Sequence, residues 1–324
     1  MKTTFKGLVL LARPTDWVKN MFVVPALLAS GKASDPHAVW HTVIAFMSFS
    51  LVASGVYCIN DALDRHQDKH HPVKRHRPIP AGLVSPTAAY VSGIIWIVLG
   101  LAATAPVASW VLVWVLAAYL ALQVAYNAVL KRINVVDVVA LSLGFVLRAV
   151  AGACAIGVPA SLWLVSSVFF LCLFLAQIKR LCDIISISQT GAGSRISDST
   201  TGTAAPADWQ PPAGYRSAEE LRWMLACSSA LSILTFLAYA MSSTSTVHPG
   251  VGIRGFVLLT PLPVISMFRF YRAASRGGYD SPLMITMTEP IVIISNTLFA
   301  AGAVWMLYAP WGRDVLLKLF LLEP

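Results

Sequence analysis

Long runs of apolar residues recur along the whole of this 324-residue chain, and they constrain its fold more than any other feature. A helix needs about 20 consecutive apolar residues to cross a bilayer, and the sequence offers about nine such segments. They lie at 21–31 (the shortest), 39–59, 88–106, 108–127, 134–155, 160–178, 222–242, 252–270 and 289–309. The runs do not alternate with polar residues, as strands of a membrane barrel would. We therefore predict an all-α fold, a polytopic membrane bundle of about nine transmembrane helices.

The composition favours a single membrane domain over residues 1–324. Hydrophobic residues make up 57% of the chain and charged residues only 12%, about half the charged fraction of a typical soluble protein. Residues 1–20 are expected to form an interfacial N-terminal segment. Residues 189–214 are rich in Ser, Thr, Gly, Ala and Pro, and we expect a flexible cytoplasmic loop there because such a stretch buries too little apolar surface to become ordered.

The distribution of Lys and Arg predicts the orientation of the chain in the membrane. Of the 24 Lys and Arg residues, nineteen lie on one set of ends and loops, four on the opposite set, and Arg148 lies inside a predicted helix. By the positive-inside rule the basic set is cytoplasmic. We expect a multi-pass protein of a bacterial inner membrane, with its active site facing the cytoplasm. The net charge of +9 gathers on that face and implies an anionic partner there, besides the lipid bilayer; no nucleic acid is expected.

The segment "YCINDALDRHQDKHHPVKRHRPIPAG" at 57–82 joins two apolar runs and carries three aspartates, five Lys or Arg and four His. Asp61, Asp64 and Asp68 are spaced i, i+3, i+7, so a helix that continued past Asn60 would project all three from one face. Adjacent carboxylates repel one another, and Mg²⁺, which is bound by a few hard oxygen ligands, relieves that repulsion. The alternative is a solvated helix end whose aspartates pair with nearby Lys and Arg.

The stretch "NDALDRHQD" resembles the N-D-x-x-D-x-x-x-D motif of the UbiA-type prenyltransferase superfamily, at Asn60, Asp61, Asp64 and Asp68. The resemblance extends over most of the chain. It implies a UbiA-like helical bundle in which this motif binds Mg²⁺ and a diphosphate at the cytoplasmic mouth. On this resemblance Asp61, Asp64 and Asp68 are the expected metal ligands, and Asp61 and Asp64 are also expected to be catalytic.

Further stretches resemble one branch of that superfamily, the decaprenyl-phosphate phosphoribosyltransferases. They are "RPTDWVKN" (from Arg13), "HPVKRHRPIPAG", "YNAVLK", "LRAVAG" and "IKRLCD". Aspartate stands where glutamate is expected at Asp183 and at Asp137. The residues that the resemblance implies in substrate binding are Lys19, Asn20, Asn60, Lys74, Arg75, Arg77, Tyr126, Lys131, Asp137 and Arg148. Those that it adds to the catalytic set are Lys179, Arg180 and Asp183.

The resemblance implies a Mg²⁺-dependent transfer of 5-phosphoribosyl from phosphoribosyl diphosphate to a polyprenyl phosphate such as decaprenyl phosphate, in the synthesis of cell-envelope polysaccharide precursors. The surplus of cations agrees with it, because this donor carries a 5-phosphate besides its diphosphate, and Lys and Arg recognise such groups. One alternative is prenyl transfer from a prenyl diphosphate to an aromatic acceptor. Another is a transporter, although the charges of transporters commonly lie near the membrane midplane, whereas here they gather at one face.

Arg148 lies alone inside a predicted transmembrane helix. A cation at such a position is costly and normally faces the protein interior, where it meets a partner. Asp137 lies eleven residues earlier, on nearly the same helix face but about 16 Å away. We therefore expect Arg148 to meet a substrate phosphate or a carboxylate of another helix.

Overall fold

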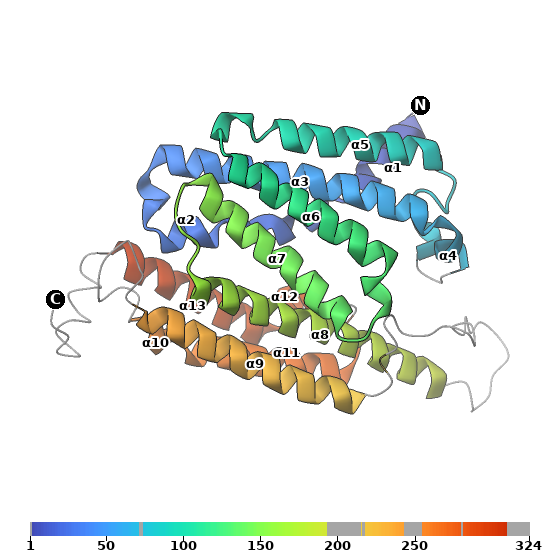
Figure 1. Cartoon of the computed structure of the whole chain (residues 1–324). Coiled ribbons are helices and arrows are strands. Elements are labelled where there is room, and N and C mark those ends of the chain that lie inside the picture. The colour runs from blue at the N-terminus through green and yellow to red at the C-terminus, as the bar shows by residue number, and fades with distance from the viewer. Residues whose placement is uncertain are drawn as a thin grey trace, which may run out of the picture. The chain divides into compact units, whose positions relative to one another are not determined.

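The computed structural model describes residues 2–70, 74–192, 215, 218–242, 255–279 and 281–309, and every regular element in this part of the chain is a helix (Figure 1). The α-helices, with the 3-10 helices written η, are α1 (Lys2–Ala12), η1 (Pro14–Val23), α2 (Pro25–Ala29), η2 (Lys32–Ser34), α3 (Pro36–Leu63), α4 (Arg65–His70), η3 (Lys74–His76), α5 (Pro86–Ala102), η4 (Ala105–Val107), α6 (Trp110–Ala128), η5 (Leu130–Arg132), α7 (Val136–Ala155), α8 (Leu162–Ala192), α9 (Ala218–Met241), α10 (Phe256–Leu259), α11 (Pro261–Arg276), α12 (Pro282–Thr288) and α13 (Pro290–Tyr308). The predicted all-α fold is confirmed.

Seven helices of the described part are long and apolar enough to cross a membrane, so the chain is an integral, multi-pass membrane protein. They are α3, α5 with η4, α6, α7, α8, α9 and α13. Each coincides with one of the predicted crossings, which confirms the membrane bundle; the count of about nine is approximate.

The two remaining predicted crossings are not single long helices. The run at 21–31 falls on the end of η1 and on the short helix α2, which is followed by Gly31 in the left-handed region. The run at 252–270 falls on α10 and α11, which are separate helices that meet at Pro261. Proline lacks the N–H that would continue a helix, and hydropathy alone does not register that break.

Helix α8 extends well beyond the predicted end of its crossing at residue 178, and reaches Ala192. The first residues of the predicted flexible loop, 189–192, are therefore helical. The rest of that loop, 193–214, lies outside the described residues.

The chain divides into two compact units, and each is described by itself. Unit 1 comprises residues 1–27, 33–129 and 147–159, and unit 2 comprises the remainder. In unit 1, α3 runs along α5 (Figure 1). A Cβ on Gly55 would press against the carbonyl oxygen of Gly93, and the reverse also holds. Small residues let membrane helices approach closely, so this glycine pair fixes the α3–α5 contact.

The 3-10 helix η1 packs against α3 through a row of side chains three residues apart. Trp17 donates from Nε1 to Oγ of Ser54 (3.0 Å), and Asn20 donates from Nδ2 to Oγ of Ser50 (3.0 Å). Three residues of a 3-10 helix and four of an α-helix both rise about 6 Å, so the two rows stay in register. Such a long 3-10 helix is uncommon, and this matched spacing stabilises it.

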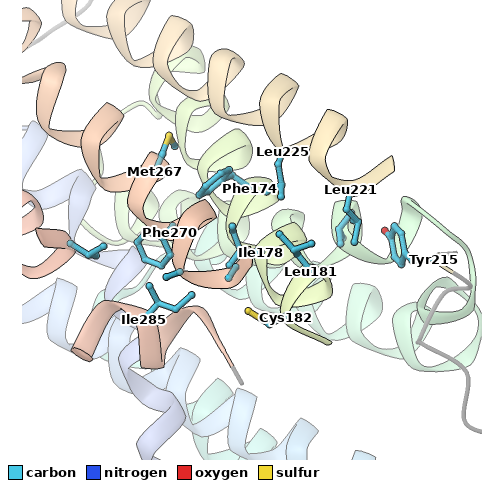
Figure 2. Packing of buried hydrophobic residues seen from close by; sticks show 14 residues of the cluster. Phe174, Ile178, Leu181, Cys182, Tyr215, Leu221, Leu225, Met267, Phe270 and Ile285 are labelled. Carbon is cyan, nitrogen blue, oxygen red and sulfur yellow. The ribbon is translucent and has the colours of Figure 1, made fainter. Parts of the chain in front are cut away.

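A large apolar cluster of unit 2 lies mainly among α8, α9, α11 and α12, with Val138 of α7 and Val292 of α13 (Figure 2). Its fully or nearly fully buried side chains include Phe174, Ile178, Leu181, Leu221, Leu225, Phe270 and Ile285. Figure 2 shows Phe174, Ile178 and Leu181 along one helix, facing Leu225 of α9 and Phe270 of α11. This cluster fixes the part of α8 that carries the "IKRLCD" residues.

Candidate functional site

The acidic segment of unit 1 is built around one arginine that bonds two aspartates. Asp61 lies in the last turn of α3 and Asp68 in α4, and both are almost fully buried. Nη1 of Arg77 lies 3.0 Å from Oδ1 of Asp61 and 2.7 Å from Oδ2 of Asp68. The pairing of aspartates with local cations, which the sequence left as an alternative to a metal site, is thus present.

The second carboxylate oxygen of Asp61 has no hydrogen-bond partner among the residues that the structure describes. Its Oδ1 accepts from both Arg77 and Arg13, whereas its Oδ2 is buried without a hydrogen bond in the described part. A buried charged oxygen left without a partner is costly. A hard divalent cation such as Mg²⁺ is the kind of group that satisfies a carboxylate oxygen, so the residues present fit the expected metal.

The three aspartates do not lie on one continuous helix, contrary to the geometry expected from their spacing. Helix α3 ends at Leu63, and Asp64 caps it with ψ near 1°, outside the helical region. Asp68 therefore belongs to a separate short helix, α4. Among the described residues, no three His, Cys, Asp or Glu side chains gather closely enough to hold a metal by themselves; Mg²⁺ also takes substrate oxygens and waters as ligands.

Arg13 contributes to this cluster, although it was absent from the predicted site residues. Its Nη2 lies 2.6 Å from Oδ1 of Asp61, and its backbone is left-handed, with φ 49°. Burial would lower the pKa of Arg13, but the Asp61 carboxylate more than offsets this and raises it above the ordinary value. A strained non-glycine backbone persists only where its surroundings determine it, so the ion pair holds Arg13 in place.

The other predicted residues of this part lie around the cluster or along η1. Lys74 Nζ is 4.0 Å from Oδ1 of Asp68, and exposed Arg75 donates to Nε2 of His76. The backbone carbonyl of Asn60 accepts from the N–H of Asp64. Lys19 pairs with Asp16 one 3-10 turn away, at 2.7 Å.

Arg148 is buried among polar and aromatic side chains of unit 1. Its Nε donates to Oδ1 of Asn20 (2.7 Å) and its Nη2 to the hydroxyl of Tyr119 (3.2 Å). The guanidinium also lies over the rings of Phe49 and Tyr119. The predicted residues Asn20 and Arg148 are thus brought together in one network, which ties η1 to α6 and α7.

Unit 2 holds the second group of predicted residues, in the C-terminal half of α8. Lys179 Nζ lies 2.7 Å from Oδ1 of Asp183, one turn away on the same helix. Arg180 donates from Nε to Oδ2 of Asp137 (2.8 Å), and its Nη1 is 3.5 Å from Oδ2 of Asp183. The structure therefore joins Asp137 of α7 to the basic pair of α8.

Tyr215 completes this network and was not predicted. Its hydroxyl donates to Oδ1 of Asp137 (2.7 Å) and accepts from the N–H of Val135 (3.1 Å). Burial and then the bond to Asp137 raise the pKa of Tyr215, which keeps its hydroxyl protonated. No local sequence pattern marks this residue, because its partner lies 78 positions away.

The two remaining predicted residues lie on either side of the unit boundary. Tyr126 is in the last turn of α6 in unit 1, and Lys131 is in η5 in unit 2.

A further polar group in unit 2 is centred on Glu289. Tyr279 donates to its Oε1 (2.6 Å), and Nη2 of Arg269 lies 3.5 Å from its Oε2. The hydrogen bond to Glu289, followed by burial, raises the pKa of Tyr279.

Comparison with known proteins places these clusters in a wider context. Residues 20–282 match the model of the UbiA prenyltransferase family. The chain is 39% identical over 208 residues to a Mycolicibacterium smegmatis protein named decaprenyl-phosphate phosphoribosyltransferase, over 60% of this chain and 63% of that protein. A Corynebacterium glutamicum protein of the same name is 38% identical over 202 residues, which is 60% of each chain. The matched region thus spans less than two thirds of the length of either relative.

A solved structure shares the fold. It is a UbiA homologue from Archaeoglobus fulgidus bound to DMAPP and Mg²⁺, with a TM-score of 0.64 and 20% identity. The likeness covers 93% of this chain and 99% of that one.

Proposed function

Because the chain belongs to the UbiA prenyltransferase family, we propose that it is a membrane-bound transferase that moves 5-phosphoribosyl from phosphoribosyl diphosphate to a polyprenyl phosphate. The reaction requires Mg²⁺, releases diphosphate and takes place at the cytoplasmic face of a bacterial inner membrane. The relatives named decaprenyl-phosphate phosphoribosyltransferase support this choice of donor and acceptor. The product serves the synthesis of cell-envelope polysaccharide precursors.

The observation that carries the proposal is the buried Asp61 carboxylate: two arginines share one of its oxygens, and the other has no hydrogen-bond partner among the described residues. Asp61 and Asp68, with Asp64 at the bend between their helices, would hold Mg²⁺. The bound ion supplies positive charge to the diphosphate, which makes it a better leaving group. Arg77 and Arg13 fix the carboxylates and add two positive charges beside them, where an anionic ligand is stabilised.

In the proposed step the bond between ribose C1 and the diphosphate oxygen breaks, and the electron pair leaves with the diphosphate. An oxygen of the polyprenyl phosphate forms the new bond to C1, with inversion. That phosphate is already anionic near neutral pH, so the chain needs no strong general base. The protein's own contribution is then positioning and charge stabilisation, which agrees with clusters made of Lys, Arg and Asp.

The cations of both units serve as phosphate contacts. In unit 1 they are Lys19, Lys74, Arg75 and Arg77, and in unit 2 they are Lys131, Lys179 and Arg180. Lys179 and Arg180 each face Asp183, which keeps their charged groups near one another. Arginine binds phosphate through two parallel hydrogen bonds and lysine as a point charge.

The test is an assay of the purified full-length chain with Mg²⁺, labelled phosphoribosyl diphosphate and decaprenyl phosphate. We expect a labelled lipid that forms only when Mg²⁺ and both substrates are present. A parallel arm supplies a labelled prenyl diphosphate with 4-hydroxybenzoate as aromatic acceptor. Turnover in that arm, without labelled lipid in the first, would replace this proposal by aromatic prenyl transfer.

A further inference from the structure

Two buried aspartates of this chain differ in how their oxygens are used. Asp61 in unit 1 keeps one buried oxygen without a hydrogen-bond partner in the described part of the chain. Asp137 in unit 2 is 0% exposed, and both of its oxygens are engaged: Oδ1 accepts from Tyr215 and Oδ2 from Arg180. A carboxylate that is fully enclosed and hydrogen-bonded on both sides offers no oxygen to a substrate or a metal without breaking those bonds.

We infer that Asp137 and Tyr215 are positioning residues, which orient Arg180 toward a phosphate group of a substrate. This inference rests on the proposed function and deepens it. It assigns Asp137 a role other than the substrate contact expected from the sequence. It also adds Tyr215, which lies 35 positions after Arg180 in the chain.

The geometry of Arg180 supports this role. Its side chain is 11% exposed, and Nε, the nitrogen closest to the helix, is held by Asp137 at 2.8 Å. A guanidinium is planar and rigid, so a bond at Nε sets the plane of the whole group. Its Nη1 lies 3.5 Å from Oδ2 of Asp183, in the "IKRLCD" motif that also carries Lys179. Bidentate binding of phosphate requires such a fixed plane. Lys179, the neighbouring cation, is 41% exposed and pairs with Asp183 on its own helix at 2.7 Å.

The turn before α7 has a strained backbone, and the contacts of Tyr215 hold it in place. Val135 has φ 67°, a left-handed conformation that is rare for a β-branched residue. Its N–H donates to the hydroxyl of Tyr215, which in turn donates to Asp137. Tyr215 thus stabilises the strained turn and also fixes the carboxylate of Asp137, in the first turn of α7. Strain of this kind is typical of functional sites.

The experiment measures ligand binding to the purified full chain by calorimetry, with two probes in separate arms. Inorganic diphosphate represents the leaving group of the donor, and a short-chain polyprenyl phosphate in detergent represents the acceptor. We expect Tyr215→Phe to weaken binding of one probe about tenfold, the usual effect of losing a hydrogen bond to a charged group. The affected probe tells which substrate Arg180 contacts.

A double-mutant cycle separates positioning from a general effect on folding. If Tyr215 acts through Arg180, Tyr215→Phe adds little to the loss caused by Arg180→Gln, because residues of one network are not additive. Additive losses, or an unchanged Kd for both probes with a lower Tm, would overturn the inference. Tyr239→Phe is the matched control: Tyr239 is also buried in unit 2, among apolar side chains, and its substitution leaves binding unchanged.

A second variant tests whether the strained turn alone explains the effect. Val135→Gly removes the conformational penalty of the left-handed backbone. If Tyr215 only held that turn, Val135→Gly would restore binding to Tyr215→Phe; we expect no restoration. Diphosphate is released by phosphoribosyl and prenyl donors alike, so this binding test stands even if the activity assay fails to produce the labelled lipid.

Discussion

Nη2 of Arg13 lies 2.6 Å from Oδ1 of Asp61 and so joins residues 48 positions apart in the chain. Arg13 precedes η1, and Asp61 lies in the last turn of α3. The ion pair therefore sets the position of the acidic cluster relative to the segment that carries Lys19 and Asn20.

The first prediction concerns Arg13 itself. Arg13→Gln removes the charge that helps to hold Asp61, so we expect the Mg²⁺ concentration for half-maximal activity to rise about tenfold, with a smaller change in KM for the lipid. Arg13→Gly removes the strain of the left-handed backbone together with the side chain, and it should raise the Mg²⁺ requirement as Arg13→Gln does. The exposed Arg272 of α11 provides the control, and Arg272→Gln should leave the Mg²⁺ requirement unchanged. If Arg13→Gln and Arg272→Gln raised the Mg²⁺ requirement equally, the effect would come from the lower net charge and not from the contact with Asp61.

The second prediction separates the aspartates. Asp61→Asn should lower activity about 100-fold or more, because the amide replaces the oxygen that is without a partner and leaves Arg13 and Arg77 with a neutral acceptor. Asp35 caps the other end of α3 by accepting from the N–H of His37. Asparagine caps a helix equally well, so Asp35→Asn should retain full activity. Full Mg²⁺-dependent activity of both Asp61→Asn and Asp64→Asn would mean that the metal is held elsewhere.

The third prediction is steric. A Cβ on Gly152 of α7 would collide with the backbone carbonyl of Val23, which cannot rotate away as a side chain could. Gly152→Ala should therefore destabilise the protein by about 1–3 kcal/mol, measured as a lower midpoint of thermal unfolding in detergent. At Gly302 the added methyl would meet the end of the Leu259 side chain, which can move. A larger loss for Gly302→Ala than for Gly152→Ala would contradict this account of η1 packing.

The fourth prediction concerns Arg148. Lysine keeps the charge, but its single ammonium does not reproduce the fork that bonds Asn20 and Tyr119 or the contact with two rings. Arg148→Lys should cost about 1–3 kcal/mol of stability, and Tyr119→Phe less, because that bond is the longer of the two. Thermal unfolding of the three proteins tests the order. Unchanged stability of Arg148→Lys would instead support a role in substrate contact alone.

Much of the fold follows from the sequence because a bilayer imposes a length on every crossing. Helices α3 and α13, for example, lie where their apolar runs predicted them. The apolar run at 21–31 does not form the long helix predicted from it, for a physical reason. Its residues are apolar, but Pro25 and the left-handed Gly31 limit the helix between them to five residues.

The site residues were identified by spacing and resemblance, but their contacts were not. Asp61 and Asp68 share Arg77 across a bend at Asp64, and a pattern that assumes one straight helix has no means of placing that bend. Tyr215 and Arg13 reach their carboxylates over 78 and 48 positions. Such pairs depend on how whole helices pack, and no local periodicity encodes them.

The matched rise of η1 and α3 also restricts how the length of this segment can vary. A 3-10 helix turns by about 120° per residue, so a single insertion between Trp17 and Asn20 would rotate the amide away from Ser50 and Arg148 together. Exposed residues such as Val18, which is 44% exposed, can be substituted without breaking these contacts. An insertion or deletion in the segment would break them. Homologues that keep this contact should therefore tolerate substitution in the segment while its residue count stays constant.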